Sequence, residues 1–147
     1  MDKRTYFIDT SALFKRYVEE EGSTVVNQIF DANVNRFISI LTLSEVVSNL
    51  KRLVEIDAVI NNEEFAMVKE TFLSEIGIDH LHIIEASPEI VLQSLELCSK
   101  QYLAPLDAIQ LATALSINDY NPVFLCADHK LTRTAIKLGL ETLNPEV

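Results

Sequence analysis

Apolar and polar positions alternate along the chain in two distinct patterns. Short apolar runs bounded by polar or turn-forming residues are typical of buried strands. Four such runs cover residues 4–8, 36–40, 80–84 and 122–126, and the segment LETLNP near the end is compatible with a short fifth strand. The pattern therefore predicts a sheet of four to five strands.

Between these runs, apolar residues recur three and four positions apart, which is the spacing of a helix with one buried face. This spacing predicts helices over residues 11–20, 23–32, 42–60, 62–75, 88–101, 105–115 and 128–138. Strands that alternate with helices indicate an α/β fold with a mostly parallel sheet. In such sheets the functional site lies beyond the carboxyl ends of the strands, where the strand order reverses.

The chain has 147 residues, of which 48% are hydrophobic, so we expect one domain with a sizeable core. The N-terminus does not resemble a signal peptide, and no apolar run approaches the roughly 20 residues that span a bilayer. Cys98 and Cys126 stand in apolar contexts without a CxxC motif, which favours buried thiols over a disulfide. We therefore expect a cytoplasmic protein that does not associate with membranes.

The formal net charge of −10 argues against a broad basic surface for nucleic acid. It does not exclude a nuclease, because the acids of a catalytic site contribute to it, although the balance stays acidic without four of them. Several basic residues nevertheless stand near the acidic motifs discussed below, where they form either a local track for nucleic acid or solvated helix faces. They are Lys15, Arg16, Lys51, Arg52, Lys130 and Arg133.

Four acidic residues stand where helices are expected to begin. Asp9 and Asp128 each follow a strand and suit the N-cap position. Asp107 falls in a first helical turn, where the helix dipole favours an acid. Thr42 and Glu45 match the S/T-x-x-E capping box. Taken singly, the two helix-opening acids are better explained by capping, and the two strand-following acids are explained equally well either way.

As a set, the four acids favour chemistry. Strand ends and the helices that follow them fall on one edge of a parallel sheet, so the carboxylates meet if the strands before Asp9 and Asp128 are neighbours. Crowded carboxylates raise one another's pKa or require a cation. An all-oxygen cluster suits Mg²⁺ or Mn²⁺ better than zinc. Metal-assisted phosphoryl transfer is the chemistry that uses such clusters.

Four segments in this order resemble the PIN domain family, and most of all the VapC-type toxins of toxin–antitoxin pairs. They are FIDTSALFKRY, ISILTLSEV, LAPLDAIQLATAL and FLCADHKL. The resemblance covers essentially the whole chain. It implies a single domain over residues 1–147, built as a three-layer sandwich with a central, mostly parallel sheet of four to five strands flanked by helices.

The resemblance also implies a ribonuclease that depends on Mg²⁺ or Mn²⁺. The family's acidic residues correspond here to Asp9, Glu45, Asp107 and Asp128. Among these, Asp9 and Asp107 would be the firmest metal ligands, and the other two would complete the pocket, hold a second metal or orient water. Ser11, or its neighbour Thr10, resembles the small polar residue that the family places beside the first acid.

The partners that the resemblance implies are an RNA substrate, a small cognate antitoxin and a second copy of the chain in a homodimer. An acidic surface suits a basic partner of this kind. Two alternatives stay open, namely a PIN-fold binding module that does not cut and a PIN nuclease without an antitoxin. A phosphotransfer enzyme of the haloacid-dehalogenase type is disfavoured, because Ser11 stands where its second aspartate would be needed.

Overall fold

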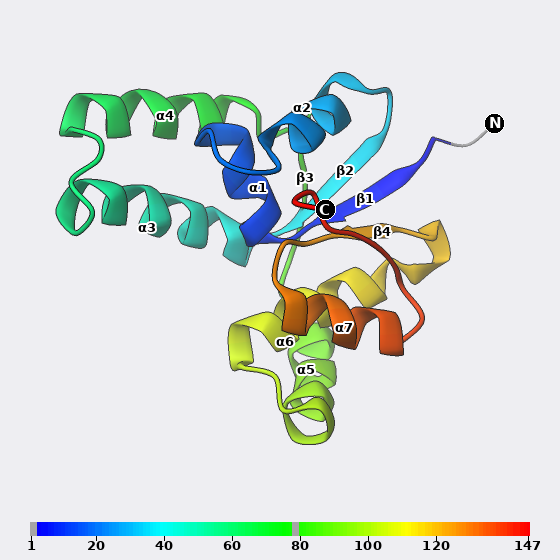
Figure 1. Cartoon of the computed structure of the whole chain (residues 1–147). Coiled ribbons are helices and arrows are strands. Elements are labelled where there is room, and N and C mark those ends of the chain that lie inside the picture. The colour runs from blue at the N-terminus through cyan, green and yellow to red at the C-terminus, as the bar shows by residue number, and fades with distance from the viewer. Residues whose placement is uncertain (1–2, 78–79) are drawn as a thin grey trace.

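A sheet of five parallel strands forms the centre of the protein (Figure 1). The structure is a computed structural model that describes residues 3–77 and 80–147. The strands lie in the order β3-β2-β1-β4-β5. They are β1 (Thr5–Ile8), β2 (Asn35–Ser39), β3 (His82–Ile84), β4 (Val123–Leu125) and β5 (Glu141–Leu143). The fifth strand is therefore present, and the order reverses between β1 and β4.

Helices cover both faces of this sheet, which confirms the three-layer α/β fold. In the described part of the chain they are α1 (Thr10–Tyr17), α2 (Ser23–Asp31), α3 (Leu41–Glu55), α4 (Asn62–Ser74), α5 (Pro88–Gln101), α6 (Pro105–Ser116) and α7 (His129–Lys137), with a 3₁₀ turn η1 (Asn118–Tyr120). Helices α1 to α4 lie on one side and α5 to α7 on the other, and α3 and α4 pack side by side and project beyond the sheet (Figure 1).

Two cores separate the layers, because successive strand residues point to opposite faces. Phe7 points toward α5, α6 and α7, where its ring stacks 5.9 Å from that of Phe124. The next residue, Ile8, points toward α1 to α4 and packs in the other core with Ile38 and Leu125. The described residues contain no helix long and apolar enough to cross a bilayer.

The predicted helix boundaries fail in two places. The helix predicted to reach residue 60 ends at Glu55, because the chain turns and Ala58 adopts a positive φ of 52° that no helix accommodates. The apolar residues Ile56 and Val59 in this turn are 70% and 66% exposed, so they are not core positions. Similarly, α1 ends at Tyr17 rather than at residue 20. The start of the third predicted strand also shifts, to His82, and its preceding residues 78–79 lie outside the described part.

Two of the basic residues near the motifs belong to partly buried ion pairs. Arg16 pairs with Glu75 at 2.7 Å, donates to Asn27 and lies 4.5 Å from the centre of the Phe30 ring. Lys15 is only 4% exposed and pairs with two glutamates near α1 and the C-terminus. Neither interpretation of Lys15 and Arg16, as a nucleic-acid track or as a solvated helix face, is therefore correct.

We expect Arg16→Met to lower the free energy of unfolding by about 2–4 kcal/mol, because it leaves the mostly buried Glu75 without its cation. Burial alone would raise the pKa of Glu75, but the hydrogen bonds and charge of Arg16 hold that pKa below its ordinary value. Urea unfolding at neutral pH measures the change. The matched control is Lys100→Met, which removes an exposed pair with Glu96 and should change nothing measurable. Equal effects of the two substitutions would contradict the structural role of Arg16.

Candidate active site

Asp9 directly follows β1 at the point where the strand order reverses. Its carboxylate accepts hydrogen bonds from the Ser11 backbone N–H at 3.1 Å and from Ser11 Oγ at 2.6 Å, so it caps α1. Its backbone N–H donates to the carbonyl of Leu125 on the neighbouring strand β4. The side chain is 5% exposed. Asp9 is thus both a helix cap and a buried carboxylate at the switch point.

Ser11 connects the end of β1 to the end of β4. Besides donating to Asp9, its Oγ accepts a hydrogen bond from the Ala127 backbone N–H at 3.0 Å. The Cys126 thiol lies 3.6 Å from Asp9 Oδ2 and 3.8 Å from Ser11 Oγ. Burial, and then the charge of Asp9, raise the pKa of this thiol to about 12, so it stays protonated. In this arrangement Ser11 positions Asp9.

Glu45 points into the site and does not cap its helix. Helix α3 begins at Leu41 and lacks a side-chain cap, so the capping box predicted for Thr42 and Glu45 is absent. The reason is register, because Thr42 lies inside the first turn and is fully buried. The Glu45 carboxylate instead accepts hydrogen bonds from Thr10 Oγ1 at 2.7 Å and from Gln110 Nε2 at 3.1 Å.

Gln110 is a site residue that the sequence reasoning missed. It is 1% exposed, and its Nε2 also lies within hydrogen-bond distance of Thr10 Oγ1 at 3.0 Å and Thr42 Oγ1 at 2.8 Å. This network joins α1, α3 and α6 beneath the acids. The available signal was an amide placed three residues after Asp107 in an otherwise apolar helix, because residues three apart share a helix face.

Asp107 and Asp128 complete the acidic edge. Asp107 lies half-buried in the first turn of α6. Burial raises its pKa, the charges of Asp128 and Glu45 raise it further, and Lys130 opposes them. Asp128 is exposed and caps α7, where it accepts a hydrogen bond from the Leu131 N–H at 2.8 Å.

Electrostatic interactions link the four carboxylates. Burial is the main cause that raises the pKa of Asp9 to about 6, the hydrogen bonds from Ser11 oppose it, and the charges of Asp107 and Glu45 add to it. The charge of Asp107 therefore acts on Asp9, and the charges of Asp128 and Glu45 act on Asp107. The parallel sheet therefore brings all four acids of the sequence prediction to one edge.

The described carboxylates at this edge do not form a ready metal site. Within residues 3–77 and 80–147, no three acidic, histidine or cysteine side chains converge closely enough to hold a metal ion directly. The donor chemistry nevertheless fits Mg²⁺ or Mn²⁺, which take carboxylate oxygens and keep several waters. A cation would also stabilise the ionised form of the buried Asp9. The assignment of Asp9 and Asp107 as the firmest metal ligands stays a prediction.

The fold and the site together define an α/β protein with acidic side chains at the carboxyl edge of a parallel sheet. Residues 6–137 match the PIN domain family, and the chain belongs to this family. No curated protein matches the chain in sequence.

Solved structures of similar fold include a toxin–antitoxin complex from Klebsiella pneumoniae, with 20% identity, a TM-score of 0.62 and coverage of 96% of this chain and 98% of that one. DNA-bound VapBC from Salmonella typhimurium has 16% identity, a TM-score of 0.65 and coverage of 97% and 98%. FitAcB from Neisseria gonorrhoeae has 15% identity, a TM-score of 0.68 and coverage of 96% and 98%. These likenesses support the fold.

The buried Asp9 predicts a specific pH dependence of stability. Below about pH 3 the carboxyl is protonated in both folded and unfolded chains. As the pH rises from about 4 to about 6, the unfolded chain ionises first, and the free energy of unfolding falls by about 3 kcal/mol, which corresponds to a pKa raised from 3.8 to about 6. We expect Asp9→Asn to remove this loss while its amide oxygen still caps α1.

Urea unfolding of wild type and Asp9→Asn between pH 4 and 7.5, without divalent cations, measures the difference. The gap should widen in favour of the variant as the pH rises. The control is Asp57→Asn, which changes an exposed loop acid and should run parallel to wild type. A parallel Asp9→Asn curve would show that Asp9 is not buried in its charged form.

The polar network under the acids predicts coupling between Gln110 and Thr10. Gln110→Met should destabilise the fold by about 1–3 kcal/mol, because the amide donor is lost from buried polar partners. When Gln110→Met is combined with Thr10→Val, the loss of stability should be smaller than the sum of the two single losses by more than about 0.5 kcal/mol. Thr113 supplies the control, since its hydroxyl bonds only the Ile109 carbonyl within α6. Thr113→Val and Thr10→Val should be additive, and equal coupling in both pairs would contradict the network.

Proposed function

We propose that the chain acts as a single domain of residues 1–147 and is a metal-dependent endoribonuclease, the VapC-type toxin of a toxin–antitoxin pair. The observation that carries the proposal is the placement of Asp9 at the switch point of a PIN fold, with the charges of Asp107 and Glu45 acting on it and that of Asp128 acting on Asp107. The reaction is hydrolysis of an RNA phosphodiester that leaves a 5′-phosphate and a 3′-hydroxyl.

The four carboxylates would have different roles in this reaction. A divalent cation in such a site supplies activation of water and stabilisation of the leaving oxygen. Asp9 and Asp107 would hold it. Ser11 fixes the Asp9 carboxylate by a hydrogen bond, and the pKa of Asp107 responds to the charges of the neighbouring acids. Glu45 and Asp128 would complete the pocket or orient the attacking water. Ser11 would contribute by holding the Asp9 carboxylate rather than by attacking substrate.

Lys130 is the basic residue best placed to meet a substrate phosphate at this edge. It is exposed, its charge lowers the pKa of Asp107, and its ammonium donates to the carbonyl of Tyr102. The nearby Arg133 is also exposed. Of the basic residues named in the sequence analysis, Lys130 and Arg133 of α7 are therefore the candidates for substrate contact, whereas Lys51 and Arg52 lie on α3, where Lys51 pairs with Glu55.

The antitoxin and the second subunit would use different apolar surfaces. A cleft of about 440 Å³ between α3 and α4 is lined by Leu43, Val47 and Leu73, and it suits an apolar segment of a small antitoxin. The net charge of −10 suits basic residues on that partner. Leu92 and Leu95 of α5 are 64% and 57% exposed and offer a face for a second copy of the chain.

A second candidate function is a PIN-fold binding module that docks a partner without cutting. One observation favours it, because the described carboxylates are not gathered into a ready-made metal site. A nuclease without an antitoxin differs from the lead proposal only in its partner, and co-purification of a small basic protein with the tagged chain would separate those two.

The decisive experiment compares wild type with Asp9→Asn on a panel of RNAs with added Mg²⁺ or Mn²⁺. We expect metal-dependent cleavage by wild type and a loss of about a hundredfold or more in the variant, because a charged group at the reacting centre is removed. The fold should persist, since asparagine still caps α1. The control Asp57→Asn should cut normally. No cleavage by wild type, or identical cleavage by Asp9→Asn, would favour the binding module.

The thermal unfolding midpoint gives a readout that does not depend on finding the right RNA. At pH values above 6, Mn²⁺ should raise the unfolding temperature of wild type, because it binds the folded chain. It should raise the midpoint of Asp9→Asn much less.

A further inference from the structure

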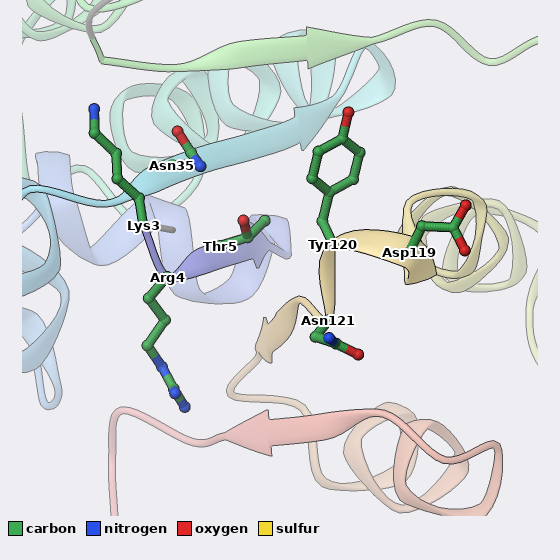
Figure 2. A pocket seen from close by; sticks show the side chains of 7 residues that line it. All are labelled: Lys3, Arg4, Thr5, Asn35, Asp119, Tyr120 and Asn121. Carbon is green, nitrogen blue, oxygen red and sulfur yellow. The ribbon is translucent and has the colours of Figure 1, made fainter. Parts of the chain in front are cut away.

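A second pocket lies at the edge of the sheet opposite the acids. Its volume is about 590 Å³, which is within the range of small-molecule sites. The starts of β1 and β2 line it together with the turn that leads from η1 into β4, as Figure 2 shows. The acids follow the carboxyl ends of the strands, whereas this pocket faces the amino ends, so the two sites are distinct.

Tyr120 gives this pocket an open aromatic surface. Its side chain is 62% exposed, and its ring lies 6.2 Å from Phe37, which in turn lies 5.2 Å from His82. The backbone around it is fixed, because Asn121 takes a positive φ of 49° and its N–H donates to the Asn118 carbonyl at 2.9 Å. An anchored aromatic ring with an open face is the platform on which nucleobases stack.

Lys3 supplies a cation on the same side of the sheet. The side chains of Lys3, Asn35 and Tyr120 project to one side of β1, whereas Arg4 projects to the other (Figure 2). Arg4 pairs with Glu141, and Lys3 forms no ion pair with the part of the chain that the structure describes. In a chain of net charge −10, a cation and an open aromatic ring that line the same pocket favour an anionic ligand with a planar group.

The remaining polar side chains match the other parts of a nucleotide. The amides of Asn35 and Asn121 each carry donors and acceptors that suit a base edge. The exposed Asp119 carboxylate can accept hydrogen bonds from ribose hydroxyls and would disfavour a ligand that is only an anion. Aromatic, cationic, amide and carboxylate side chains therefore all line this pocket.

We propose that this pocket binds one nucleotide unit, with the base stacked on Tyr120 and the phosphate beside Lys3. The unit is either a free nucleotide or one residue of an RNA strand. The four residues of β1 span about 13 Å, so a strand of several nucleotides is long enough to reach both edges of the sheet. The RNA source rests on the proposed function, whereas nucleotide binding itself does not.

The test titrates adenosine 5′-monophosphate, adenosine and inorganic phosphate separately into the full chain, followed by calorimetry. The nucleotide should bind more tightly than either of its parts. Tyr120→Leu and Lys3→Gln should each weaken it about five- to tenfold, because one removes the stacking surface and the other the cation. The matched controls are Tyr120→Phe, which keeps the ring, and Lys137→Gln, which removes an exposed lysine of α7. Neither should change binding.

Absence of nucleotide binding at millimolar concentration, or binding that both pocket variants leave unchanged, would overturn the proposal. Asp9→Asn, expected to leave RNA intact, then separates the two sources of nucleotide. An adenylate hexamer that binds at least about tenfold more tightly than the mononucleotide, and loses this on Tyr120→Leu, supports the RNA source. A hexamer that binds the pocket no better supports a free nucleotide.

The pocket and the nuclease can fail independently. Nucleotide binding without RNA cleavage by wild type would retain the pocket and reject the proposed function. RNA cleavage without nucleotide binding would do the reverse.

Discussion

Burial of the Asp9 carboxylate between β1 and α1 is the constraint on which the site depends. Strand β1 leads directly into helix α1 at this point, and the first turn of the helix needs a cap for its free N–H groups. Asp9 supplies the cap, and Ser11 holds its carboxylate while also bonding the backbone after β4. Capping and chemistry are therefore not alternatives for Asp9, because the geometry that caps the helix also buries the charge beside Asp107 and Glu45.

Three helices hold the Glu45 carboxylate through a polar network rather than through direct contact with Asp9. Gln110 joins Thr10, Thr42 and Glu45 across α1, α3 and α6, and it turns the Glu45 carboxylate inward. Because these groups are buried, each bond left unmade would cost more than its formation gains. The network thus joins α1, α3 and α6 next to Asp9, Glu45 and Asp107, and rigid helices are better supports for a site than loops.

Most elements were predictable because their signals are local. Apolar periodicity located the strands and helices. The failures come from features that local patterns do not encode. The turn after α3 depends on a left-handed Ala58 without a glycine or proline to mark it. The partner of Arg16 lies 59 positions away, so sequence neighbours could not reveal that this cation is structural. Gln110 was overlooked because an amide in an apolar helix has no motif of its own.

Most of the cations discussed above pair with glutamates away from the acidic edge, so the carboxylates at that edge have few cationic partners. Arg16 and Lys15 neutralise glutamates elsewhere in the fold, and Lys130 is the cation that lowers the pKa of Asp107. The influences that raise the pKa of Asp9 are burial and two neighbouring carboxylates, and only hydrogen bonds from Ser11 oppose them. The folded chain therefore carries a negative charge that its own described side chains do not balance. A divalent cation and a basic side chain of a partner would both relieve this imbalance. Under the proposed function, the activating metal and an inhibiting partner would therefore bind the same few carboxylates.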